Sequence, residues 1–213
     1  MPPTLRRLCL PLTALAVLLP SVSVALELDD VAREGELRFL AQRPDPGAYW
    51  YESRVRIGPE SLETGLVDLN TCHHALDPNQ RIVVAFNAQR VQSIQIASTE
   101  GVGRAWVDGH RVELADVQRG GKVCIDLRSR ALERMDGGQR FRLHAGPLMR
   151  RYLDGYLPMQ ARLHFAWPQG LLAVASTQPV AQPGVQVDAQ SSGLRMDLVF
   201  AGRMNATVVL QRP

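Results

Sequence analysis

From residue 36 onward, apolar and polar residues alternate in many short stretches. In 122–127 the apolar residues Val123, Ile125 and Leu127 share one side of the chain, and polar residues and a cysteine share the other. A period of two residues is typical of a strand with one buried face. The stretches predicted as strands are 36–41, 49–57, 66–74, 81–87, 91–98, 104–114 (a hairpin), 122–127, 139–144, 159–167, 171–176, 193–200 and 204–211.

Glycine, proline and aspartate separate these stretches. Asp108-Gly109 between two strand-like arms predicts a hairpin with a two-residue turn. The prolines in 177–186 argue against a central strand there. Only two stretches, 129–135 and 147–156, have the residue pattern of short helices.

Many short strands separated by turns predict an all-β fold. We expect an antiparallel β-sandwich, immunoglobulin-like or jelly-roll-like, with one or two short helices. Residues 36–213 are long enough to bury a core as a single β-sandwich domain. A sub-boundary near residue 146 is the alternative, but the piece after it holds only four predicted strands.

The first 25 residues have the layout of a cleaved secretory signal peptide. Arg6 and Arg7 precede an apolar run over 8–20, and small residues end at Ala25, where we expect cleavage. The run is shorter than the ~20 residues that cross a bilayer, and no later stretch is longer. We therefore predict a flexible segment over 26–35, a mature chain without a transmembrane segment, and a periplasmic or secreted location.

The charge balance argues against nucleic-acid binding. The chain has 24 basic and 21 acidic residues, and the predicted signal peptide removes two arginines and no acid, which leaves 22 against 21. A protein that binds phosphate backbones normally concentrates basic residues on one face. No nucleic-acid partner is predicted.

Two cysteines, Cys72 and Cys124, remain after removal of the signal peptide. Strand alternation places each on the polar side of its strand, where neighbouring strands can be bridged. Exported proteins fold in oxidising compartments, where disulfides persist. We therefore predict a Cys72–Cys124 disulfide.

The sequence Cys-His-His at 72–74 raises an alternative. A periplasmic zinc- or copper-binding protein could use Cys72, His74 and Cys124 together with His144 or His164. The chain has no C-x-x-C or H-x-x-x-H pair that would pre-form half of such a site, and a disulfide would consume the thiols. The prediction is that no metal is bound.

Catalytic signatures are missing from the sequence. It has neither a G-x-S-x-G nor an H-E-x-x-H motif, so no catalytic residue and no cofactor are predicted. A hydrolase of an envelope polymer, with acids scattered along the chain, is a third hypothesis.

The connection between the strands 139–144 and 159–167 contains Arg150, Arg151, Tyr152 and Tyr156. Loops often carry function, and arginine and tyrosine are enriched at binding hot spots. A short helix that closes one end of the sandwich is the alternative role for this connection.

Arg142 and Arg162 lie on the polar faces of the two flanking strands, beside His144 and His164. If these strands are neighbours, the side chains form a cationic patch. The leading hypothesis is therefore an exported, non-catalytic binding or assembly module for an unknown envelope protein or anionic ligand.

Overall fold

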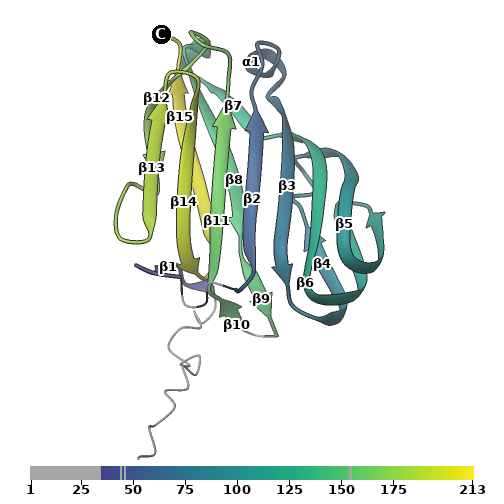
Figure 1. Ribbon diagram of the computed structural model, residues 1–213. Coiled ribbons are helices and arrows are strands. Elements are labelled where there is room, and N and C mark those ends of the chain that lie inside the picture. The colour runs from purple at the N-terminus through teal and green to yellow at the C-terminus, as the bar shows by residue number, and fades with distance from the viewer. Residues whose placement is uncertain (1–34, 44, 46, 154) are drawn as a thin grey trace, which may run out of the picture.

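The computed structural model describes residues 35–213 except 44, 46 and 154, and Figure 1 shows its arrangement. The predicted signal peptide over 1–25 and all but the last residue of the segment 26–35 lie outside the described residues. The described part is mostly β-structure with several antiparallel sheets. Within it, no helix is long and apolar enough to cross a bilayer.

The elements follow one another as a series of strands with one short helix and one 3₁₀ turn. They are β1 (Arg38–Phe39), β2 (Trp50–Arg56), α1 (Ser61–Thr64), β3 (Leu66–Leu76), β4 (Asn79–Ala85), β5 (Val91–Asp108), β6 (Arg111–Arg130), β7 (Leu132–Met135), η3 (Asp136–Gly138), β8 (Arg140–Leu148), β9 (Arg150–Tyr152), β10 (Gly155–Leu157), β11 (Met159–Ala166), β12 (Ala173–Gln178), β13 (Val185–Gln190), β14 (Gly193–Ala201) and β15 (Met204–Gln211).

The large sheet has the order β1-β14-β11-β2-β3-β6-β4, with β13 also paired to β14 and β5 also paired to β6. Its strands pair antiparallel, as expected, except that β2 and β11 run parallel. A parallel pair needs a long connection, and the whole of β3 to β10 lies between these two strands. A second sheet has the order β12-β15-β8-β7.

Inward side chains of the two sheets share one hydrophobic core. Leu163 on β11 and Phe200 on β14 come from the large sheet, and Phe141 on β8 and Leu210 on β15 come from the small one. All four are at most 1% exposed, so the two sheets pack face to face. The immunoglobulin-like or jelly-roll-like type stays a prediction.

The β5–β6 hairpin contributes to a second core. This core contains Val112 and Leu114 from the start of β6 and Ile125 and Leu127 from its end. The buried positions change from even to odd numbers along the strand, and the change accompanies Asp116, whose φ is +55°. A strand residue with a positive φ interrupts the regular alternation, so the side chains after it are re-aimed.

Neither predicted helix forms. Residues 129–135 complete β6 and form β7, and residues 147–156 complete β8 and form most of the β9–β10 hairpin. In 129–135, pairing of β6 with β3 and of β7 with β8 overrides a weak helical preference. The one α-helix in the described part of the chain is the single turn α1.

Most predicted strands are confirmed, with differences at turns and edges. The hairpin predicted at 104–114 forms, but Asp108 pairs with Arg111, so the two turn residues are Gly109 and His110. Only Gly109 of these two has a positive φ, +56°, as a type II′ turn requires. The strand β13, which follows the prolines of 177–186, lies at the edge of the large sheet, where proline-flanked strands are tolerated.

Candidate functional site

A cavity of about 350 Å³ lies between the large and the small sheet. Inward side chains of β2, β3 and β11 form one wall of the cavity. Residues 143–149, which lie on β8 and just after it, form another wall, and the β4–β5 connection closes a third side. Its exposed lining residues are Ala85, Asn87, Met149 and Arg203. They form two groups at opposite ends of the cavity: Ala85 and Asn87 at the end of β4, and Met149 and Arg203 just after β8 and β14.

The interior of the cavity is mainly apolar. Leu69, Leu143, Leu163 and Phe165 line it from two strands of the large sheet and one of the small sheet. Strand alternation explains their position, because every second residue of β2, β3 and β11 faces the small sheet. Cavities of this size and lining are typical of sites for small apolar ligands.

Two hydroxyl groups of the cavity lining already have partners. The hydroxyl of Tyr49 lies 2.8 Å from Nδ1 of His73, and the hydroxyl of Thr71 donates to the carbonyl of Ile125 at 3.5 Å. Burial raises the pKa of Tyr51 to about 12, so this phenol stays protonated at neutral pH. An apolar ligand would therefore leave the hydroxyls of Tyr49 and Thr71 with their hydrogen bonds.

Tyr49, which lines the cavity, pairs with the buried His73. The Tyr49 hydroxyl and Nδ1 of His73 are 2.8 Å apart, and the imidazole meets the ring of Tyr51 edge-on at 5.2 Å. Burial lowers the pKa of His73 to about 4 and raises the pKa of Tyr49. Both groups are therefore neutral at pH 7, and Nε2 of His73 has no hydrogen-bond partner in the described structure.

Three basic residues contribute to the lining of the cavity. Arg90 is half-buried and Arg203 is exposed. His144, the third basic residue of the lining, lies 3.3 Å from Glu133 on the neighbouring strand. Among the residues that the structure describes, no aspartate or glutamate lines the cavity.

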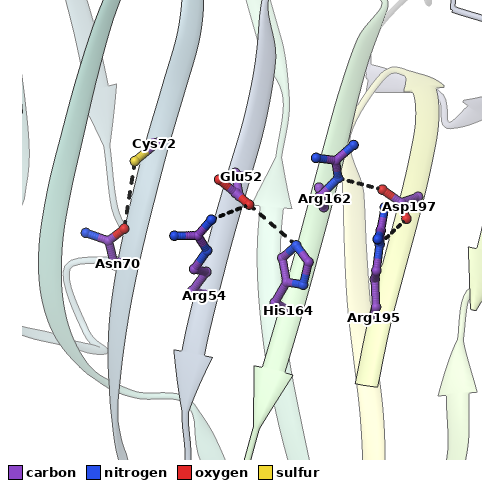
Figure 2. Close-up of polar contacts among 8 residues, drawn as sticks. All are labelled: Glu52, Arg54, Asn70, Cys72, Arg162, His164, Arg195 and Asp197. Atoms are coloured by element: carbon purple, nitrogen blue, oxygen red, sulfur yellow. Dashed lines mark hydrogen bonds and ion pairs between the residues drawn. The ribbon is translucent and has the colours of Figure 1, made fainter. Parts of the chain in front are cut away.

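The outward face of the large sheet holds a network of charged side chains, which Figure 2 shows. Nε of Arg162 donates to Asp197 at 2.9 Å, and Nε2 of His164 lies 3.4 Å from Glu52. The guanidinium of Arg162 also stacks over the ring of Trp50 at 5.5 Å. Acids thus offset the basic groups of this face.

The expected cationic patch does not form. Arg142 and His144 lie on β8 in the small sheet, where both contact Glu133 at 3.3 Å. Arg162 and His164 lie on β11 in the large sheet. The two strands are not neighbours, because the chain between them changes sheets after the β9–β10 hairpin.

The Cys72–Cys124 disulfide is present, with the two residues directly paired across β3 and β6 and their Cα atoms 4.1 Å apart. Both side chains lie on the outward face, as the alternation predicts, yet they are less than 10% exposed. Sγ of Cys72 is 3.8 Å from Oδ1 of Asn70. Because a bonded sulfur carries no hydrogen, this is a van der Waals contact.

The structure does not bring the alternative metal ligands together. The disulfide occupies the sulfurs of Cys72 and Cys124, and His74 stacks on Trp50 with 3.8 Å between ring centroids. His144 lies in the other sheet. In the described part of the chain, no three histidine, cysteine, aspartate or glutamate side chains are grouped to hold a metal ion.

The residues singled out in the 144–160 connection lie on the β9–β10 hairpin. Arg150 forms an ion pair with Asp77 and lies 5.5 Å from the ring of Tyr49, so it is largely buried. Arg151 donates to the carbonyl of Leu153. Tyr152 is 59% exposed and Tyr156 is half-buried. The hairpin therefore presents Arg151 and Tyr152 to solvent, whereas Arg150 connects the hairpin to Asp77 and Tyr49.

Arg90 and Arg203 are not recognisable from the sequence. Each stands alone among ordinary turn and strand residues, and only the packing of the two sheets places them on one cavity. Another part of the cavity lining can be predicted from the sequence. The alternation over 49–55 predicts that Tyr49, Tyr51 and Ser53 face the same side of their strand.

Comparisons with known proteins leave the family open. No protein-family model and no curated protein matches the chain. Among solved structures, an M1 zinc metallopeptidase from Deinococcus radiodurans is 9% identical with a TM-score of 0.39, and the match covers 84% of this chain and 43% of that one. Legionella pneumophila aminopeptidase A in complex with aspartic acid is 7% identical with a TM-score of 0.36, and the match covers 82% and 22%.

The chain thus spans less than half the length of either structure. At TM-scores below 0.5, these similarities carry no argument about activity.

Proposed function

We propose that the protein is an exported, non-catalytic binding protein whose cavity between the sheets holds an elongated apolar molecule. The observation that carries the proposal is the cavity of about 350 Å³ with mainly apolar walls. Pockets for small ligands are typically 300–1,000 Å³ and mostly apolar. Their few polar groups normally set the orientation of the ligand.

Two features support export. The N-terminal residues have the pattern of a signal peptide, and Cys72 and Cys124 form a disulfide, which is typical of oxidising compartments. An apolar molecule has low solubility in such an aqueous compartment. A carrier with an enclosed apolar cavity would shield it from water.

A chain-length series of neutral alcohols tests the proposal. We expect 1-octanol, 1-nonanol and 1-decanol to bind with increasing affinity, measured by isothermal titration calorimetry. Each methylene group removed from water contributes about 0.8 kcal/mol, which corresponds to a roughly fourfold change in Kd. Equal affinity for all three alcohols, or no binding, would contradict an apolar cavity site.

Variants that fill the cavity locate the binding. Ala131 and Ala145 line the cavity from the end of β6 and from β8, so Ala131→Leu and Ala145→Leu should each weaken decanol binding about tenfold or more, since each adds a bulky side chain to the ligand's space. Ala189→Leu on β13 is the control, because Ala189 is exposed and lies outside the lining. If decanol binds all three variants as it binds the wild type, the ligand occupies another place.

A further inference from the structure

Exposed apolar side chains lie at one end of the two sheets. Leu37 is 39% exposed and its Cα is close to Gly202. Met149, also 39% exposed, directly follows β8, whose last residue pairs with Met204 at the start of β15. The β9–β10 hairpin continues from there at the same end of the molecule (Figure 1). We call residues 35–49, 149–158 and 202–203 the hairpin end.

The tip of the hairpin has an unusual residue in its turn. Tyr152 pairs with Gly155, so Leu153 is the first of two turn residues. The φ of Leu153 is +51°, a backbone conformation that glycine, asparagine and aspartate adopt with less strain than leucine. Leu153 is also 78% exposed, and Tyr152 is 59% exposed. A leucine that is both strained and exposed lowers the stability of the isolated chain, which points to a contact outside it.

The hairpin end is basic. Its segments contain five arginines and three acids, which gives a net charge of +2. Residues 26–213 as a whole are nearly neutral, with 22 basic and 21 acidic residues. Arg151 and Arg203 are exposed, and neither forms an ion pair with a residue that the structure describes. The excess of positive charge therefore lies beside the exposed apolar side chains.

This combination of side chains suits the surface of a lipid bilayer. Tyrosine and leucine enter the boundary between head groups and acyl chains, whereas arginine stays at the level of the phosphates. One end of the apolar cavity also lies here, because Met149 and Arg203 line it. An apolar ligand that leaves a bilayer at this end would reach the cavity without crossing water.

We propose that the hairpin end docks on the surface of an anionic lipid bilayer, with Tyr152 and Leu153 among the head groups and Arg151 and Arg203 beside lipid phosphates. The argument from the cavity rests on the proposed function. The arguments from exposure, strain and charge do not depend on it.

Co-sedimentation with lipid vesicles at neutral pH tests the docking. The probes are vesicles of phosphatidylcholine alone and vesicles in which about a third of the lipid is anionic phosphatidylglycerol. We expect the protein to bind the anionic vesicles at least about fivefold more tightly than the neutral ones. This difference should shrink as salt is raised. All proteins compared carry the same N-terminal residues, so a difference between them comes from the substitution.

An apolar substitution tests the tip of the hairpin. Leu153→Asn removes the exposed apolar side chain and introduces a residue that tolerates the positive φ. It should fold at least as well as the wild type and bind anionic vesicles at least about threefold more weakly. Val107→Asn is the matched control and should bind as the wild type does: Val107 is 42% exposed and pairs with Val112, which also pairs with Val84 beside Ala85, at the opposite end.

Two further substitutions test the charge. Arg151→Gln and Arg203→Gln should each weaken binding to anionic vesicles about threefold or more and leave binding to neutral vesicles unchanged. Arg111→Gln is the matched control, because Arg111 is exposed and pairs with Ala85 at the opposite end. Circular dichroism checks that each variant is folded. If Leu153→Asn does not fold, Tyr152→Ser takes its place with the same expectation.

Equal binding to both kinds of vesicle, or no binding, would overturn the inference. Variants of the hairpin end that bind as the wild type does, or an equal loss in the two controls, would overturn it as well. Sedimentation without vesicles that Leu153→Asn abolishes would show that a second copy of the chain covers the hairpin end instead. Failure of the alcohol series would reject the proposed function but leave vesicle binding as it is, so the two results are separable.

Discussion

His73 is a buried, titratable side chain. It lies between Tyr49 and Tyr51 on the inward face of β3, and burial lowers its pKa from 6.5 to about 4. A buried imidazole loses hydration when it is charged, so the folded protein resists its protonation. In the unfolded chain the imidazole is hydrated and takes up a proton at its ordinary pKa. Because the pKa of His73 differs between the folded and the unfolded state, the free energy of unfolding depends on pH.

The sign of this dependence follows from proton binding. Between pH 6.5 and pH 4 the unfolded chain holds a proton on His73 that the folded protein lacks, so the free energy of unfolding falls as the pH is lowered through this range. The expected loss from His73 is roughly 3 kcal/mol, and it is absent above pH 6.5. Urea unfolding at a series of pH values measures it.

A variant isolates the contribution of His73. His73→Gln keeps a polar partner for Tyr49 but cannot titrate, so its stability should fall less between pH 6.5 and pH 4 than that of the wild type. The pKa values of His74 and His164 are also lowered by burial, and their contribution stays in both proteins. His110→Gln in the β5–β6 turn is the control. Identical slopes for wild type and His73→Gln would show that His73 is not the group that titrates.

At the scale of elements, the junction between β14 and β15 depends on one glycine. Gly202 has a φ of +97°, and a Cβ there would lie 1.9 Å from the carbonyl oxygen of Glu36. The segment before β1 therefore packs directly against this turn. The adjacent residue, Arg203, donates its backbone N–H to Gly35 at 3.1 Å.

We expect Gly202→Ala to lower the free energy of unfolding by about 3 kcal/mol, because backbone strain and a clash with Glu36 add together. Gly109→Ala is a matched comparison: Gly109 also has a positive φ, +56°, but a Cβ there meets nothing within 4 Å. It should lose only about 1–2 kcal/mol from backbone strain. Urea denaturation compares the two, and equal losses would show that the contact at Glu36 is unimportant.

At the scale of the whole molecule, the disulfide closes a large part of the chain. Cys72 and Cys124 are 52 residues apart in sequence, and β4, β5 and more than half of β6 lie within this loop. Much of the second core belongs to these elements. A crosslink of this length restricts the unfolded chain strongly.

Removing the disulfide should lower the free energy of unfolding by about 4 kcal/mol in the chain-entropy description. The variant Cys72→Ala/Cys124→Ala and the chemically reduced wild type should lose similar amounts in urea denaturation. The variant should not respond to reductant, which serves as the control. A loss below about 1 kcal/mol would mean that the loop is already restricted in the unfolded chain.

The sequence predicts those parts of the molecule that depend on local alternation. The strands over 66–74 and 122–127 and the disulfide between them follow from the positions of Val67, Val123 and the two cysteines. The helical expectation for 129–135 is wrong because strand pairing with distant segments outweighs a short local preference. The cavity depends on which sheet each strand joins, and alternation along one strand carries no information about that.

The parallel pairing of β2 with β11 has a consequence for the order in which the chain is made. One edge of β2 can pair with β3 as soon as residue 76 has been synthesised, but its other edge stays open until residues 159–166 follow. During that interval the growing polypeptide presents an unpaired edge that other extended chains can join. This edge therefore needs protection by a chaperone until β11 occupies that position.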